Sequence, residues 1–186
     1  MKELSLNILD ITENSTKAGA TLVKIEITET EDVLTIAITD DGTGMTPDVL
    51  LSVTNPFYTT RTTRRVGMGI PLFRFAAEQT GGKLTIVSRH IDEFPDDHGT
   101  TVEAVFNKKH IDFTPLGDVI SSVTTLIQGH PTVDFLFSHV FGERIVSLDT
   151  RELRAVLDDV PLDTFEVIMW IRDNLTEQYE VFNKNK

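Results

Sequence analysis

The segment 59–71 gathers residue types that could bind an anion. It contains two glycines one residue apart, Gly67 and Gly69, and no acidic residue. Between positions 49 and 77 there is no aspartate or glutamate, although the chain carries a formal charge of −12; the arginines of this window are Arg61, Arg64, Arg65 and Arg74. Glycine lets the backbone approach a ligand, a helix start offers free N–H groups, and arginine binds phosphate through two hydrogen bonds. The pattern predicts a phosphate site, and the alternative is a solvated loop with arginines clustered by chance.

A polar stripe near the N-terminus could bind a metal ion. Asn7, Asp10, Asn14 and Lys17 recur at helical spacing, beside an apolar stripe rather than opposite it. An amide oxygen on Asn14, one turn from the carboxylate of Asp10, could hold Mg²⁺ directly or through water. The alternative is an ordinary boundary stripe. The solvated face of the same helix is predicted to consist of Ser5, Thr12 and Thr16.

The stretch Asp-Asp-Gly-Thr-Gly-Met, residues 40–45, follows an alternating apolar run directly. A carboxylate fixed at a strand end, here Asp40, could accept a hydrogen bond from an exocyclic amine. Gly42 and Gly44 would let a flat ring approach the backbone. The alternative is a simple turn.

Two common phosphate-binding patterns are absent from the sequence. No G-x-x-x-x-G-K-[ST] stretch is present, and Leu72 stands where a dinucleotide-binding turn needs its third glycine.

Helices and strands must position these residues, and periodicity predicts both. Helices are predicted over 3–19, 70–82, 116–129, 150–158 and 164–178. Strands are predicted over 22–29, 33–39, 83–90, 100–106, 132–139 and 145–148. Residues 48–66 are predicted to form a long loop with one helical turn. The order predicts an α+β fold with a mixed sheet and helices on one face.

Composition excludes several function classes. The 186 residues are 40% hydrophobic and 25% charged, as in soluble globular proteins. A pI near 4.7 argues against general binding to nucleic acid or anionic membranes. The absence of cysteine excludes disulfides and thiolate sites and suits a cytoplasmic location.

The order and spacing of the polar motifs resemble the Bergerat-fold ATP-binding domain, which gyrase, Hsp90-type chaperones, histidine kinases and MutL-type repair proteins share. The resemblance covers residues 4–106. Residues 10–21 resemble the N box, 40–45 the first glycine box, 55–61 the phenylalanine box of kinase lids and 66–72 the second glycine box.

The resemblance implies roles for individual residues. Asn14 would bind Mg²⁺, Asp40 would recognise the adenine amino group, and Thr101 would lie beside the adenine. Residues 46–66 would form a lid over ATP, with Arg61, Arg64 or Arg65 near the terminal phosphate. The remaining residues that the resemblance puts at the ATP site are Lys17, Gly42, Gly44, Met45, Phe57, Thr60, Gly67, Met68, Gly69 and Ile70.

Two departures from the family pattern bear on activity. Hydrolysing members have glutamate where Asp10 stands, so Asp10 is the candidate base that orients water, one methylene shorter than usual. Proline at position 71 fits the first turn of a helix because no N–H is needed there.

Residues 1–108 are predicted to form the ATP-binding domain, 109–115 a connector and 116–186 a small helix–hairpin–helix appendage. None of the five histidines lies in an H-E-x-x-x-P context, which argues against a complete histidine kinase. Three functions stay open: a stand-alone ATPase or ATP-driven switch that acts on a protein partner, a protein kinase acting in trans, and a nucleotide sensor with little turnover. ATP or ADP and Mg²⁺ are the expected ligands, and a homodimer is left open.

Overall fold

The computed structural model describes residues 3–54 and 68–184. These residues form a mixed sheet of six strands in the order β3-β4-β2-β1-β5-β6. The strands are β1 (Leu22–Glu29), β2 (Val33–Asp40), β3 (Lys83–Arg89), β4 (Gly99–Asn107), β5 (Asp134–Phe141) and β6 (Arg144–Asp149). The helices are α1 (Leu4–Lys17), α2 (Pro47–Thr54), α3 (Gly69–Gln79), α4 (Val119–Gly129), α5 (Thr150–Leu157) and α6 (Phe165–Lys184).

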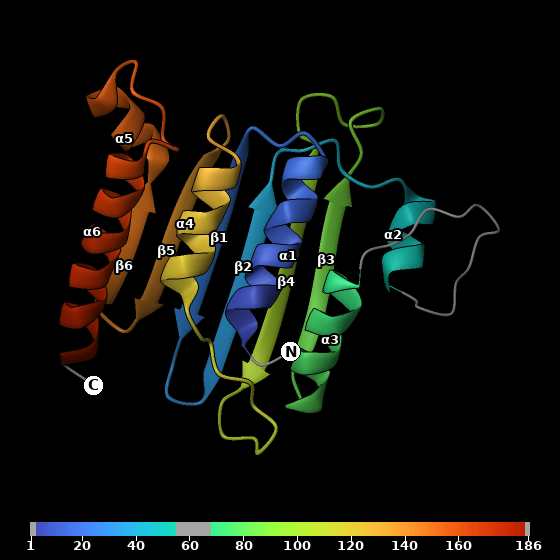
Figure 1. Ribbon diagram of the computed structural model, residues 1–186. Coiled ribbons are helices and arrows are strands. Elements are labelled where there is room, and N and C mark those ends of the chain that lie inside the picture. The colour runs from blue at the N-terminus through green and yellow to red at the C-terminus, as the bar shows by residue number, and fades with distance from the viewer. Residues whose placement is uncertain (1–2, 55–67, 185–186) are drawn as a thin grey trace.

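Helices α3, α1, α4 and α6 pack side by side on one face of the sheet (Figure 1). Side chains alternate between the two faces of each strand, and on one face they are apolar and buried, as in Val23, Ile25 and Ile27 of β1. The helices cover this apolar face. The predicted α+β class, with a mixed sheet and a helical layer, is confirmed.

Helix α5 is the exception to the prediction that helices cover one face. The guanidinium of Arg154 donates to the carboxylate of Asp134 at 2.7 Å. Asp134 alternates with the buried Phe135, so its side chain lies on the face that α1 does not cover. Helix α5 therefore packs over one end of that second face.

The prediction that Ser5 and Thr12 face solvent is wrong. Ser5 is 1% exposed and Thr12 is fully buried, because α4 packs against this side of α1. The hydroxyl of Ser122 in α4 donates to the carbonyl oxygen of Ser5 at 3.1 Å. A helix between two neighbours buries polar residues that periodicity assigns to the surface.

The second half of the chain extends the same sheet. Strand β5 pairs in parallel with β1, from Leu22 opposite Asp134 to Glu29 opposite Phe141. The division into an ATP-binding domain, a connector and an appendage stays a prediction, and both parts contribute to one core. Residues 47–54 form α2, which is longer than the single helical turn expected there.

Asp41 holds the start of β1. Its carboxylate accepts hydrogen bonds from the N–H and the hydroxyl of Thr21, at 2.7 and 2.5 Å, and from the N–H of Leu22 at 2.9 Å. Burial alone would raise the pKa of Asp41, but these hydrogen bonds together lower it below its usual value. The ionised carboxylate of Asp41 is therefore stabilised by folding, and it stabilises the folded state in turn.

Replacing Asp41 by asparagine should lower the free energy of unfolding by about 1–2 kcal/mol at about pH 7, because a charged acceptor is lost. The pKa of this carboxyl is lower in the folded state than in the unfolded state, where it is about 3.9. The carboxylate therefore stabilises the fold fully above the unfolded pKa, and this contribution disappears as the pH falls through the folded pKa. The difference between the wild type and Asp41→Asn should therefore shrink below about pH 4. Urea unfolding across this range measures it, with Asp159→Asn, an exposed carboxylate between α5 and α6, as the control. An equal difference at low and neutral pH would contradict the charge-based explanation.

Candidate functional site

The sequence motifs meet at the end of the sheet where β2 ends, β4 begins and α1 reaches its C-terminus (Figure 1). Asp40, the last residue of β2, pairs with Thr100 near the start of β4. Helix α1 lies above them, and the loop 41–46 passes between α1 and the end of β3.

The carboxylate of Asp40 is nearly buried, with 9% of the residue exposed, and is held from three directions. The hydroxyl of Ser15 in α1 donates to one oxygen at 2.6 Å. The N–H groups of Gly42 and Thr100 donate to the other, at 3.0 and 3.2 Å. A buried carboxylate with fixed orientation and remaining lone pairs can accept a further hydrogen bond from a ligand.

The glycine loop is connected to the elements on both sides of it. The N–H of Thr43 donates to the carbonyl of Ala18 at 2.9 Å, and the N–H of Met45 donates to the Ser88 hydroxyl at 2.8 Å. Gly44 has a φ of +70°, and a Cβ atom there would lie 2.0 Å from the carbonyl oxygen of Arg89. Only glycine fits this position without moving the backbone.

Thr100, and not the predicted Thr101, lies beside Asp40. The side chain of Thr101 is on the other face of the sheet, where its hydroxyl lies 3.1 Å from that of Thr39. A cavity of about 270 Å³ at this end of the sheet is lined by Asp40, Thr100 and Thr101, and none of the α1 stripe residues lines it. Strand alternation and the pairing of Asp40 with Thr100 explain why Thr100 is the threonine next to this carboxylate, while the predicted place of Thr101 beside the adenine stays a prediction.

Helix α1 presents only part of the predicted polar stripe. Asp10, Asn14 and Lys17 are exposed, and the ammonium of Lys17 lies 3.8 Å from the Glu13 carboxylate. Asn7 is 1% exposed, and neither atom of its amide has a hydrogen-bond partner among the described residues. A buried amide in this state is a place that a water molecule could occupy.

The first turn of α3 lies against α1 at Asp10. A Cβ atom on Gly69 would approach the Asp10 Cβ to 3.1 Å, so glycine allows the close contact of the two helices. Pro71 is the third residue of α3, as predicted for a helix start. Met68 precedes the helix and is 73% exposed, whereas Ile70 is buried at 6%. Free N–H groups and the positive end of α3 thus lie beside Asp10.

The described residues fit a nucleotide with a bound Mg²⁺ better than a metal ion alone. They contain no group of three acidic, histidine or cysteine side chains that could hold a metal. The exposed oxygens of Asp10 and Asn14 match the way Mg²⁺ is usually bound, through few protein oxygens together with water and substrate phosphates. Asp40 supplies the buried acceptor that an adenine amino group requires.

Some predicted site residues lie outside the described part of the chain. These are Phe57, Thr60, Arg61, Arg64, Arg65 and Gly67. Ser15, which is buried on α1 and is not among the predicted site residues, contacts Asp40 directly. No helix within the described ranges is both long and apolar enough to cross a bilayer.

The structure was compared with solved structures of other proteins. The Aquifex aeolicus MutL ATPase domain complexed with ADP superposes with a TM-score of 0.55 at 17% identity, over 84% of this chain and 69% of that one. The N-terminal domain of a DNA repair protein gives 0.53 at 16% identity, over 80% of this chain and 53% of that one. The mycobacterial sensor histidine kinase MprB gives 0.41 at 20% identity, over 56% and 72%. No curated protein matches the chain.

Residues 1–110 match the family model described as "Histidine kinase-, DNA gyrase B-, and HSP90-like ATPase". The match covers more than half of the 186 residues and contains α1, the glycine loop and α3. The chain therefore belongs to the family of histidine kinase-, DNA gyrase B- and HSP90-like ATPases.

Proposed function

We propose that this protein binds ATP with Mg²⁺ and acts as an ATPase or ATP-driven switch on a protein partner in the cytoplasm. Membership of the family supports ATP binding. The observation that carries the proposal is the Asp40 carboxylate, buried at a strand end and held by Ser15, Gly42 and Thr100 beside a glycine loop. This arrangement fits the amino group and the flat ring of adenine.

Each part of the site has a role in binding. Asp40 accepts a hydrogen bond from the adenine amino group, and the loop with Gly42, Gly44 and Met45 lies along the ring. The first turn of α3, at Gly69 and Ile70, directs N–H groups toward the phosphates. Thr100 takes the position beside the adenine that the family resemblance gave to Thr101, because its N–H already contacts Asp40.

Asp10 and Asn14 belong to the reacting end of the site. Asn14 would hold Mg²⁺ through its amide oxygen, and the metal would neutralise phosphate charge when bound. Asp10 orients a water molecule near the first turn of α3, which it contacts through Gly69. Lys17 adds a positive charge about one turn beyond Asn14 along α1.

The contacts of α1 on its other side support a switch. Glu13 Oε1 lies 2.8 Å from Nε2 of His130, the residue that ends α4. Helix α1 therefore touches nucleotide-site elements on one side and α4 on the other. A change at Asp10 or Asn14 would reach the second half of the chain through one rigid helix.

Three of the five histidines are buried or lie close to another residue, which makes these three poor candidates for autophosphorylation. His139 is 3% exposed, His98 lies 2.6 Å from the Gly42 carbonyl oxygen, and His130 pairs with Glu13. A kinase acting in trans and a sensor with little turnover are the alternatives. Incubation with Mg²⁺ and γ-labelled ATP, with and without cell extract, separates them: free phosphate supports an ATPase, label on another protein a kinase, and tight binding alone a sensor.

Replacing Asp40 by asparagine should weaken ADP binding about 10- to 100-fold, because a hydrogen bond to a charged acceptor is lost and an amide N–H₂ would face the adenine amine. Isothermal calorimetry measures the affinity, and thermal unfolding checks that the variant is folded. Asp96→Asn changes an exposed carboxylate at the same end of the sheet and should bind ADP like the wild type. Equal affinity of Asp40→Asn and the wild type would remove Asp40 from the nucleotide site.

Replacing Gly44 by alanine should weaken ADP binding at least about tenfold, because a new Cβ atom would displace the loop from the end of β3. Gly81→Ala is the matched control, since Gly81 has a φ of +76° but nothing lies within 4 Å of the added atom. It carries the backbone strain without the collision. If both variants bind ADP normally, the loop does not shape the nucleotide site.

Replacing Asp10 by asparagine should reduce phosphate release at least about 100-fold, since a base that orients water contributes this much or more. ATP affinity should change less than about threefold, because Asp10 is assigned to the water and not to the adenine. The control is Glu78→Gln, an exposed carboxylate near the C-terminal end of α3. Unchanged phosphate release in Asp10→Asn would exclude the role proposed for Asp10.

A further inference from the structure

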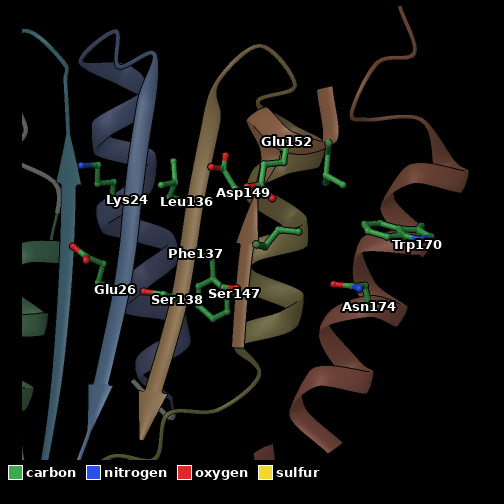
Figure 2. A pocket seen from close by; sticks show the side chains of 12 residues that line it. Lys24, Glu26, Leu136, Phe137, Ser138, Ser147, Asp149, Glu152, Trp170 and Asn174 are labelled. Carbon is green, nitrogen blue, oxygen red and sulfur yellow. The ribbon is translucent and has the colours of Figure 1, made fainter. Parts of the chain in front are cut away.

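A second cavity of about 350 Å³ lies on the face of the sheet that α1 does not cover. Strands β1, β5 and β6 form its floor, α5 closes one end and α6 forms one wall (Figure 2). This volume is in the range of small-ligand pockets. The pocket shares no lining residue with the nucleotide site, so any ligand here is a different molecule.

The walls of this pocket are fixed by hydrogen bonds. The Gln178 amide of α6 accepts from the N–H of Ser147 at 2.9 Å and donates to its carbonyl oxygen at 3.0 Å. The Thr150 hydroxyl, at the start of α5, accepts from the Phe135 N–H at 2.8 Å. Because Gln178 occupies the free edge of β6 at Ser147, the pocket does not suit an added β-strand. It suits a side chain or a small molecule.

Some charged residues of the pocket form ion pairs and others do not. Asp149 caps α5 and its carboxylate pairs with Arg151 at 2.7 Å, so its charge is already balanced. Among the described residues, Glu26 on β1 and Glu152 on α5 have no ion-pair partner. Lys24 also lines the pocket, two residues before Glu26. The lining thus holds more carboxylates than ammonium groups, and Arg151, which is not part of the lining, attracts Glu152 without forming an ion pair with it.

An aromatic side chain completes the lining. Trp170 projects from α6 at the side opposite Lys24 and is 52% exposed. Leu136 and Leu153 supply apolar surface that also lines the pocket. A tryptophan face near a carboxylate attracts a cationic group through both its π-electrons and the neighbouring charge, and an apolar stem can lie on the leucines.

We propose that this pocket binds an organic cation, an ammonium or guanidinium group on an apolar stem. The cationic end lies near Trp170 and Glu152, and Lys24 repels it from the other end of the pocket. The cation comes either from a basic side chain of a protein partner or from a free polyamine. The net charge of −12 raises the local concentration of such groups around the whole chain.

Trp170 is the only tryptophan in the chain, so its fluorescence reports on this pocket alone. Titration with N-acetyl-arginine amide should change the emission to saturation. N-acetyl-citrulline amide has nearly the same shape without the charge and should bind at least about tenfold more weakly. Spermidine represents the free polyamine; tighter binding of spermidine than of the arginine compound would identify a polyamine as the source. Equal responses to the arginine and citrulline compounds would overturn the proposal.

Variants distinguish the proposed contacts in the pocket from a general attraction of cations to the acidic chain. Glu152→Gln should weaken binding of the arginine compound about three- to tenfold, and Lys24→Met should strengthen it because the competing charge is removed. Asp173→Asn on an exposed position of α6 outside the pocket should leave the affinity unchanged. If Glu152→Gln and Asp173→Asn have the same small effect, the attraction is non-specific and the site does not exist. Asp40→Asn should bind the arginine compound normally, so failure at the nucleotide site leaves this test intact.

Discussion

Two adjacent carboxylates at the end of β2 hold together the elements on which the candidate site depends. Asp40 points toward the helical layer, where it accepts hydrogen bonds from Ser15 of α1 and from the backbone of β4. Asp41 holds the start of β1 through Thr21 and Leu22. Buried acceptors with several donors fix orientation strongly, because leaving them unpaired is costly. One dipeptide therefore links α1, β1, β2 and β4 at this end of the sheet.

The same end of the sheet connects to the second pocket through backbone and side-chain contacts. Thr21 donates its N–H to the Asp41 carboxylate. The carbonyl oxygen of Thr21 accepts a hydrogen bond from the N–H of Asp134 at 2.8 Å. Asp134 in turn accepts from Arg154 of α5, the helix that closes the pocket. The nucleotide loop and the cation pocket thus share β1 and β5 as a common support. A protein that responds to ATP through a partner would need such a shared rigid element.

Much of the fold was predictable because periodicity reports burial on one side of an element. The strands of the first half alternate and were found within a residue or two, and Pro71 correctly marked the start of α3. The burial of Ser5 and Thr12 contradicts their predicted place at the surface, because the neighbouring helix α4 is not visible in a linear pattern. The contact of Thr100 with Asp40 likewise depends on a cross-strand register that the sequence does not show.

The sequence by itself determined the types and order of the chemical groups: a carboxylate at a strand end, a glycine loop, a proline-started helix and a polar stripe on α1. It did so because turns, helix starts and close approaches require specific residue types locally. Only the tertiary structure decided which of these groups meet. The pairing of β2 with β4 selected Thr100, the packing of α3 on α1 brought Gly69 to Asp10, and the parallel pairing of β1 with β5 built the second pocket. These contacts join residues far apart in the chain, and their geometry depends on how whole elements pack.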